Sequence, residues 1–415
     1  GTPSSTIRED VALTLRPQVM TLDTLNDQAM LDVITRARTL PPGGELEIDT
    51  SHVSSVYPNG AVPLAAAIDY FNSHAVSVSP GKQSTQVQKT HLFNPMTVDK
   101  FVRYETPLTH NVWKYRNEEE AQKLADKFVE ALVDQVPCEN GVVDTFNWCL
   151  YEVMDNVFQH SGADAGFVMM QLQRKSRRCV LAIADTGGGI QRSLAVSSHG
   201  GVDRTQIKDA RNAIGYAVQQ GVTSKGKLNQ GNGLYGLARA TEINGGRLRI
   251  VSGRGIWCND PHDPGMTDLA RPVLDPENHQ ATLVDWQLDC ASPVRIEEAL
   301  GKTSPTESFI ENIEAAEGFH RIGVLEIEEA LGSRAKGSEV RTRLVNYLAA
   351  GAEIIVLDFT GVGVISSSFA DEVLGKLAVD MGELDFRRRI FVDSASPTNR
   401  SLIERAISLR LQSGV

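Results

Sequence analysis

The sequence predicts an α/β protein made of three successive α/β units. Strand-like and helix-like apolar patterns alternate near both ends of the chain, and the middle combines apolar helices with a series of strands. The 415 residues are 41% hydrophobic and 22% charged, which is typical of soluble globular proteins and allows two to four domains. We therefore expect a central α/β domain with a small α/β domain on each side.

Composition and charge argue against several classes of protein. No apolar run reaches the ~18 residues that span a membrane, and no basic-then-apolar leader opens the chain. The five cysteines occur singly, without a Cys-x-x-Cys pair, so neither a zinc site nor a disulfide framework is predicted and a cytoplasmic location is expected. The net charge of −11 disfavours nonspecific binding of nucleic acid.

The N-terminal segment 1–90 has the pattern of a small α/β unit. Residues 11–15 and 46–49 alternate like strands, whereas 24–38 and 61–71 have the apolar spacing of helices. The segment is therefore expected to fold as one layer of helices on a sheet.

A connector and two helices are expected next. Residues 91–117 are weakly periodic and contain two prolines, so we interpret them as a connector, and 118–136 reads as an amphipathic helix. A second helix, which Gly162 ends, carries its apolar residues at about 3.6-residue spacing. These residues are Phe146, Leu150, Val153, Met154, Val157 and Phe158. Glu152 and Asn156 are four residues apart and therefore share one face of that helix.

A strand that ends in an acidic residue and glycines follows this helix. Residues 167–172 and 180–184 are apolar runs typical of strands. Asp185 comes directly after the second run, and Gly187 and Gly189 follow it. A carboxylate at a strand end, next to backbone that tolerates close approach, favours a ligand-binding edge.

The second half of the central unit contains a glycine-bounded loop and a helix that begins at glycine. The loop, 221–230, carries Lys225 and Lys227, which could reach phosphate oxygens. The helix, 233–243, has free N–H groups at its start that suit an anion. Two strand-like runs come next, and the stretch between them, 252–280, is interpreted as an inserted loop.

Three motifs in this region resemble those of the GHKL ATPases, a family that includes gyrase, the large heat-shock chaperone, histidine kinases and MutL. In chain order, the likenesses to the N, G1 and G2 boxes are Glu152-x-x-x-Asn156, Asp185-x-Gly187-x-Gly189 and Gly231-Asn-Gly233-Leu-Tyr-Gly236. The resemblance covers roughly 140–288. It implies a Bergerat-type α/β sandwich over 118–290, with a lid at about 191–232 that orders over the triphosphate.

The resemblance also implies ATP and Mg²⁺ as cofactors and gives each residue a role. Asp185 is expected to accept a hydrogen bond from the adenine amine, which selects adenine over guanine. Asn156 is expected to be the magnesium ligand, and Glu152 the catalytic group that polarises the attacking water. The other expected nucleotide contacts are Gly187, Gly189, Lys225, Gly231, Gly233, Leu234, Gly236 and Thr282.

Plainer roles stay open when the residues are considered alone. Asn156 could bond to backbone, Glu152 could be a surface charge, and the two loop lysines could simply be solvated. Thr282 is preceded by Ala281, where the family usually has glycine, so this likeness is incomplete.

The segment 319–415, which follows a linker at 291–318, alternates strands and helices again. A buried strand leads into a serine-rich turn, and the stretch resembles the STAS fold of anti-anti-sigma factors. In that family an Asp-Ser-Ser/Thr-Gly turn presents a phosphorylatable serine. Here Ser366 replaces the aspartate, Ser367 matches the phosphoacceptor position and Phe369 replaces the glycine.

The N-terminal unit repeats this pattern weakly. Asp49 aligns with Asp358 at the end of a strand, but Pro58 stands where Ser367 does. A degenerate STAS-like copy and a generic α/β fragment are both consistent with the segment.

Three functions remain open from the sequence. The first is a nucleotide-dependent switch in bacterial signalling or defence, in which ATP alters the contacts of the STAS-like units with each other, a protein partner or a second copy. The second is a serine protein kinase of the anti-sigma-factor type that acts on Ser367 or on a partner. The third is an interaction scaffold with a non-hydrolysing nucleotide site. Intact motifs weigh against the third, and the altered turn around Ser367 weighs against the second.

Overall fold

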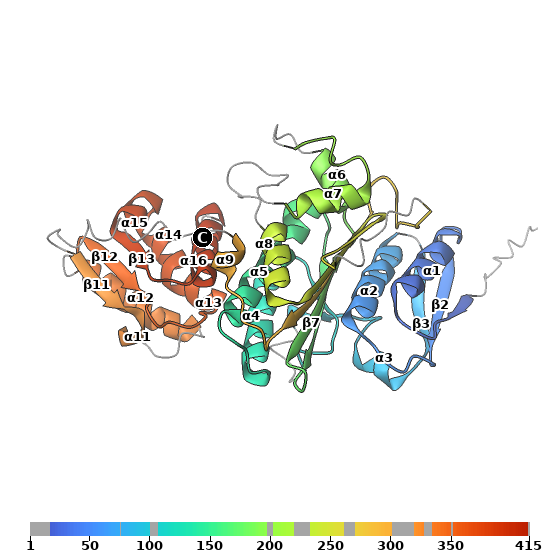
Figure 1. The fold of residues 1–415 in the computed structure, drawn as a ribbon, viewed down its shortest axis with the longest axis horizontal. Coiled ribbons are helices and arrows are strands. Elements are labelled where there is room, and N and C mark those ends of the chain that lie inside the picture. The colour runs from blue at the N-terminus through green and yellow to red at the C-terminus, as the bar shows by residue number, and fades with distance from the viewer. Residues whose placement is uncertain are drawn as a thin grey trace, which may run out of the picture.

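The chain folds into three α/β units that lie in a row (Figure 1). The N-terminal unit is at one end, the C-terminal unit is at the other, and the central unit lies between them. The computed structural model describes residues 17–74, 76–99, 107–196, 202–219, 233–260, 270–300, 319–327, 334–349 and 352–413.

In the described residues, the N-terminal unit is a parallel three-stranded sheet in the order β1-β2-β3, with helices in its crossovers. The side chain of Asn26 accepts a hydrogen bond from Ala29 N at 2.9 Å, so this cap starts the first helix three residues later than the predicted range 24–38. The predicted strand at 11–15 lies outside the described residues. The elements are β1 (Gln18–Thr21), α1 (Asp27–Arg38), β2 (Glu45–Thr50), α2 (Pro58–Ser73), β3 (Ser77–Gln83) and α3 (Thr85–Lys89).

Helix α2 is apolar on nearly all sides because two sheets enclose it. It packs on β3 of its own unit and on strands β6 and β7 of the central sheet, and Leu64 is only 1% exposed. Polar contacts fix the rim of this junction: Asn59 Nδ2 donates to Asp285 Oδ2 at 3.1 Å, and Lys114 Nζ lies 2.6 Å from Asp69 Oδ1. One face of the central sheet is therefore covered by the N-terminal unit.

The described strands of the central unit form a seven-stranded sheet in the order β4-β5-β6-β7-β10-β8-β9. Two strands come from 91–117, so our interpretation of this segment as a connector was wrong: Trp113 and Tyr115 are fully buried and extend the sheet. Strand β9 also lies inside 252–280, which we expected to be a loop. The strands are β4 (Met96–Thr97), β5 (Trp113–Tyr115), β6 (Gly166–Gln173), β7 (Arg178–Asp185), β8 (Arg247–Ser252), β9 (Gly255–Cys258) and β10 (Thr282–Asp289).

Helices α4, α5 and α8 cover the face of this sheet opposite α2 (Figure 1). Phe146 of α5 stacks on Trp286 of β10 with ring centroids 5.6 Å apart. Helix α5 passes into a π-helical turn, η2, which ends at Gly162 in the left-handed conformation. The helices are α4 (Glu118–Gln135), α5 (Val142–Asn156), η2 (Val157–Ser161), α6 (Gly189–Ala195), α7 (Ala210–Ala217), α8 (Gly233–Asn244) and α9 (Ile296–Leu300).

The C-terminal unit has the same strand order as the N-terminal unit. Its described strands form a parallel sheet in the order β11-β12-β13, with helices between them. The elements are β11 (Phe319–Gly323), α11 (Val324–Ile327), α12 (Arg334–Ala349), β12 (Ile354–Asp358), α13 (Ser367–Ala370), η3 (Asp371–Gly375), α14 (Lys376–Met381), α15 (Glu383–Arg389), β13 (Ile390–Asp393) and α16 (Pro397–Ser413). Among the helices described in all three units, none is both long enough and apolar enough to cross a membrane.

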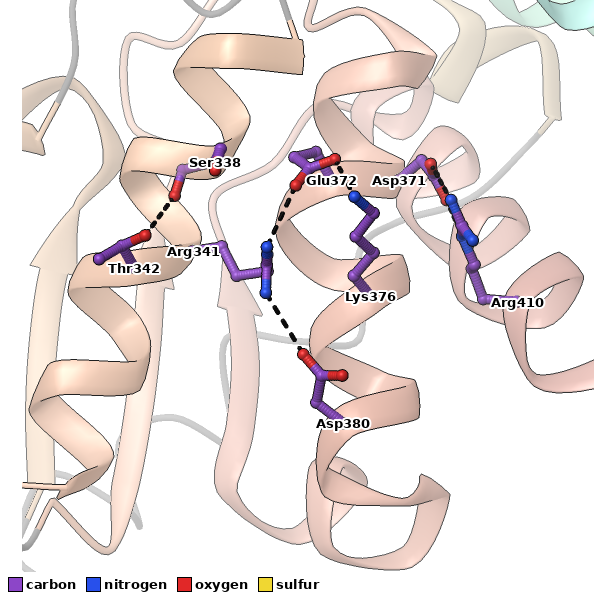
Figure 2. A network of polar contacts seen from close by, with 8 residues as sticks. All are labelled: Ser338, Arg341, Thr342, Asp371, Glu372, Lys376, Asp380 and Arg410. Atoms are coloured by element: carbon purple, nitrogen blue, oxygen red, sulfur yellow. Dashed lines mark hydrogen bonds and ion pairs between the residues drawn. The ribbon is translucent and has the colours of Figure 1, made fainter. Parts of the chain in front are cut away.

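A buried acidic residue ties the helices of the C-terminal unit together (Figure 2). Glu372 is 3% exposed and is held by Arg341 at 3.3 Å and Lys376 at 2.6 Å. Arg341 also reaches Asp380 at 3.3 Å, so one guanidinium joins α12 to both η3 and α14. A buried carboxylate needs such paired partners, which fixes how these helices pack.

Candidate nucleotide-binding site

Helix α5 places Glu152 and Asn156 against the start of helix α8. Both side chains are partly exposed. A β-carbon added at Gly233 would lie 2.8 Å from Glu152 Oε2 and 3.7 Å from Asn156 Nδ2, so the absence of a side chain brings the two helices together here. The backbone amides at the start of α8 are groups that can bind an anion beside these two side chains.

The carboxyl group of Glu152 holds its proton more firmly than an ordinary glutamate. Desolvation raises the pKa of Glu152 to about 7, the nearby positive charge of Arg405 lowers it, and the negative charge of Asp155 raises it. A carboxylate that exchanges its proton near neutral pH suits the role of a general base.

Asp185 ends strand β7 on the face of the sheet that α5 covers. It is 6% exposed, and its Oδ1 accepts a hydrogen bond from Gly187 N at 2.8 Å. Burial raises the pKa of Asp185 to about 6, while the hydrogen bond from Gly187 and the nearby Ser161 side chain lower it. Thr282 on β10 is its partner in the strand register. One edge of the sheet thus presents a carboxylate and a hydroxyl side by side.

The backbone around Thr282 is held by Ser252. Ser252 Oγ accepts a hydrogen bond from Ile190 N at 2.8 Å and lies 3.1 Å from Thr282 Oγ1. Gly189 has φ of 79° and Ala281 has φ of 66°. Ala281 therefore adopts the left-handed conformation that glycine takes most easily, at a cost to alanine of about 1 kcal/mol. The residue that departs from the GHKL pattern keeps a glycine-like backbone.

Ser161 joins the two halves of the site, and sequence reasoning missed it. It is the last residue of η2, which continues the helix directly from Asn156. Its carbonyl oxygen accepts a hydrogen bond from Gly188 N at 2.8 Å, and its hydroxyl donates to Val157 O at 2.6 Å. A β-carbon at Gly187 would lie 2.3 Å from Ser161 O. The sequence placed this serine only at a helix end, because its contacts come from packing.

Of the other residues predicted to contact the nucleotide, some pack in or against the core and some lie outside the described residues. Leu234 packs against the main core and against a small cluster on α6 and α7, and Gly236 is buried within α8. Lys225, Gly231 and the loop 221–230 lie outside the described residues.

A cavity of about 40 Å³ borders Asp185 and Thr282 from the opposite side. It is lined by Ile34 of α1, Pro63 of α2 and Leu274, and is therefore enclosed between the sheet and the N-terminal unit. This volume holds water molecules and is far below that of a small-molecule pocket.

Ser367 is buried where the C-terminal unit contacts α4 and α5. It is 1% exposed, and its backbone N and its Oγ donate to Asp126 Oδ1 at 3.0 Å and 2.8 Å. The Tyr151 hydroxyl bonds to both Asp126 and Ser367. Tyr151 precedes Glu152 and points roughly 100° away around the helix. In this arrangement the Ser367 hydroxyl is closed off from solvent.

Arg405 on α16 makes a second contact with the same helix. Its Nη2 lies 2.9 Å from Asp155 Oδ1, and its guanidinium carbon lies 5.6 Å from the centroid of the Tyr151 ring. The side chains of Arg405 and Asp155 are 17% and 21% exposed, so water screens this ion pair only partly. The C-terminal unit therefore contacts the turn of α5 that carries Glu152 and Asn156.

Across the residues described by the structure, no group of three His, Cys, Asp or Glu side chains is arranged to hold a metal ion. The amide oxygen of Asn156 is a suitable single ligand for Mg²⁺, which keeps phosphate and water oxygens as its other ligands. Gly233 adds no side chain of its own at the start of α8, where a β-carbon would meet Glu152.

A family model matches part of the C-terminal unit. Residues 336–400 match the model described as "STAS-like domain of unknown function (DUF4325)". No curated protein sequence matches the chain. The matched segment runs from α12 into α16 and includes Ser367 and Glu372. This part of the chain is therefore similar to a STAS-like domain, as its strand and serine-rich turn predicted.

Proposed function

We propose that this protein binds ATP with Mg²⁺ between α5, α8 and the end of β7, and acts as a nucleotide-dependent switch of the GHKL type. The best support for this proposal is that residues far apart in the sequence lie close together in the structure. Glu152 and Asn156 lie beside Gly233, and the helix that carries them ends at Ser161, whose carbonyl oxygen accepts a hydrogen bond from Gly188 N in the turn that follows Asp185. Motifs separated by many residues thus meet in one site with the polarity that a nucleotide needs.

Asp185 recognises the adenine in this proposal. With a pKa of about 6 it is ionised at neutral pH and can only accept hydrogen bonds. It therefore pairs with the exocyclic amine of adenine and rejects the carbonyl that guanine has at that position. Thr282, its neighbour across the strands, supplies a hydroxyl for a ring nitrogen or a bridging water.

Asn156, Gly233 and Glu152 act at the phosphates. The Asn156 amide oxygen holds the magnesium ion, which neutralises charge on the triphosphate, and the amides at the start of α8 bind phosphate oxygen. Glu152 accepts a proton from a water molecule as the water oxygen attacks the γ-phosphorus. The bond to the bridging oxygen breaks, and ADP and phosphate are released.

The C-terminal unit is the output of the switch. Tyr151 and Asp155 hold Ser367 and Arg405, while the neighbouring Glu152 and Asn156 face the nucleotide site. A ligand that shifts this turn of α5 must alter both contacts, and by linkage the docked unit alters nucleotide affinity by the same factor. A role in bacterial signalling or defence, through a protein partner or a second copy, rests on this combination of units.

The N-terminal unit is proposed to be a degenerate copy of the STAS-like fold. Both units place three parallel strands in sequential order with helices between them. Pro58 begins α2 where Ser367 begins α13, and each helix packs on the central unit. Proline removes the hydroxyl acceptor, so this copy would serve as a fixed cover of the central sheet.

The kinase alternative requires the C-terminal unit to leave its place. Ser367 is bonded to Asp126 and Tyr151 and is 1% exposed, so transfer to Ser367 needs separation of the units or a serine on a partner. A thin-layer assay with γ-labelled ATP distinguishes the functions: free phosphate indicates an ATPase, labelled protein a kinase, and unchanged ATP the scaffold.

Calorimetry with ATP and Mg²⁺ tests the site itself. Asp185→Asn should weaken ATP binding by about tenfold to a hundredfold, because a donor replaces an acceptor facing the adenine amine and a buried mismatch costs ~1–3 kcal/mol. Asp289→Asn is the matched control, since Asp289 lies at the other end of the same strand pair. Equal affinity in wild type and Asp185→Asn, or equal affinity of the wild type for GTP, would contradict the proposed site.

A further inference from the structure

Three cysteines that are far apart in the sequence meet at one end of the central unit. Cys138 lies between α4 and α5, Cys179 lies on β7, and Cys290 follows β10 directly. Backbone hydrogen bonds fix this meeting point: Glu139 N donates to Cys290 O at 2.9 Å, and Cys290 N donates to Arg177 O at 2.8 Å. The cysteines looked unrelated in the sequence because no two of them are neighbours in the chain.

Two of these thiols differ in their environment. Cys138 Sγ donates a hydrogen bond to Val136 O at 3.3 Å. The neighbouring Cys290 thiol and the charge of Arg177 lower the pKa of Cys138, whereas burial raises it. The neighbouring Cys138 thiol and burial raise the pKa of Cys290. Cys138 is partly exposed, whereas Cys290 is fully buried.

Arg177 clamps the two segments that carry the pair. Its Nε donates to Pro137 O at 2.9 Å, and its Nη2 donates to Glu139 Oε1 at 3.0 Å and to Cys290 O at 3.3 Å. The guanidinium charge also favours the thiolate of Cys138. The clamp holds together the backbone segments that carry Cys138 and Cys290, independently of any bond between their sulfur atoms.

We propose that Cys138 and Cys290 are a redox modification site, at which a hydroperoxide converts the two thiols to a disulfide. The partly exposed Cys138 thiolate attacks the peroxide oxygen, the O–O bond breaks, and Cys138 becomes a sulfenic acid while water or an alcohol leaves. The Cys290 sulfur then attacks the Cys138 sulfur, the S–O bond breaks, and water leaves with the thiol proton. The peroxide gains the two electrons that the sulfur atoms lose.

The disulfide would tie the start of α5 to the chain that leads out of the central sheet. Val294 N donates to Asn140 O at 3.2 Å, and Thr145 Oγ1 donates to Val294 O at 3.2 Å, so the two segments already run side by side. The bond would therefore form with little movement and would fix α5 relative to β10. The five cysteines are all free in the reduced protein described here.

Mass spectrometry of a non-reduced digest tests this site on the full chain. After brief exposure to hydrogen peroxide, the wild type should yield a peptide pair linked through Cys138 and Cys290, lighter by two hydrogen atoms and split by reductant. Cys290→Ser should instead accumulate a dimedone adduct on Cys138, because the second thiol is missing. Cys149→Ser is the control and should leave the linked pair unchanged, since Cys149 is buried within α5.

A second measurement uses the native wild type alone. In that protein, Cys138 should react with iodoacetamide at neutral pH at least several-fold faster than each other cysteine. A disulfide from Cys138 to Cys179, absence of any linked pair after peroxide, or equal alkylation of all five cysteines would each overturn the assignment. None of these results depends on nucleotide binding.

Discussion

Replacing Glu152 with glutamine should make the central unit more stable at alkaline pH and leave it nearly unchanged at acidic pH. The pKa of Glu152 is raised from 4.5 to about 7, chiefly by desolvation. The folded state therefore binds more protons than the unfolded state between these two values, and the wild type loses stability as pH rises from about 4.5 through 7. Glutamine is neutral at every pH and mimics the protonated acid.

The magnitude follows from the size of the pKa change. At roughly 1.4 kcal/mol for each pKa unit, the rise to about 7 corresponds to ~3 kcal/mol above neutral pH. Because the side chain is partly exposed, water reduces this value, and we expect ~2 kcal/mol at pH about 8. Below the unfolded pKa, both forms of the protein carry an uncharged group, so their difference should approach zero.

Denaturant unfolding monitored by tryptophan fluorescence measures the difference in unfolding free energy between wild type and Glu152→Gln in the central unit. All four tryptophans, Trp113, Trp148, Trp257 and Trp286, lie in the central unit. Glu130→Gln on the exposed side of α4 is the control, and its difference from wild type should not vary by more than ~0.5 kcal/mol across the same pH range. An equal stability gain for Glu152→Gln at both ends of the range would refute the account in which desolvation raises the pKa of Glu152.

Three further outcomes follow from the same contacts. If Glu152 is the base, kcat/KM for ATP hydrolysis should rise with pH through about 7, and Glu152→Gln should lower it at least ~100-fold and abolish the rise. Arg405→Met should weaken docking of the C-terminal unit by ~1–3 kcal/mol, which faster proteolytic release of that unit would show. It should also move the pH midpoint of kcat/KM upward, because Arg405 lowers the pKa of Glu152. Arg387→Met removes an exposed i,i+4 ion pair and should change neither quantity. Leu64→Ala in α2 should destabilise the junction by ~2–5 kcal/mol in thermal unfolding, whereas the exposed Val133→Ala should change it by less than ~0.5 kcal/mol.

Local patterning predicted much of the central unit. The apolar spacing around Phe146 and Val153 gave a helix, and the structure has α5 there; the runs before Gln173 and Asp185 gave strands β6 and β7. Helical periodicity also placed Glu152 and Asn156 on one face without any knowledge of the fold. These predictions succeed because burial repeats every two residues in a strand and every 3.6 residues in a helix. The repeat can therefore be recognised from residues that are close together in the sequence.

The errors lie where a short segment gains its structure from a distant one. Residues 91–117 show little periodicity, yet Trp113 to Tyr115 pair with β6 and become a buried strand. Strand β9 within 252–280 likewise exists because it pairs with β8. A three- or four-residue strand is too short for a period to stand out, so only its hydrogen-bonding partner reveals it.

The sequence by itself determined the α/β alternation, the three units, the helix that carries Glu152 and Asn156, and the STAS-like character of the C-terminal turn. Only the tertiary structure decided that α2 covers the central sheet, that Ser161 bonds to Gly188 after Asp185, that Ser367 is buried on Asp126, and that the segments carrying Cys138 and Cys290 lie side by side. The physical reason is that a pattern records how deeply each residue is buried but does not record against which surface. That choice is made when the apolar faces of separate units pack together, and it brings together polar groups that no local spacing connects.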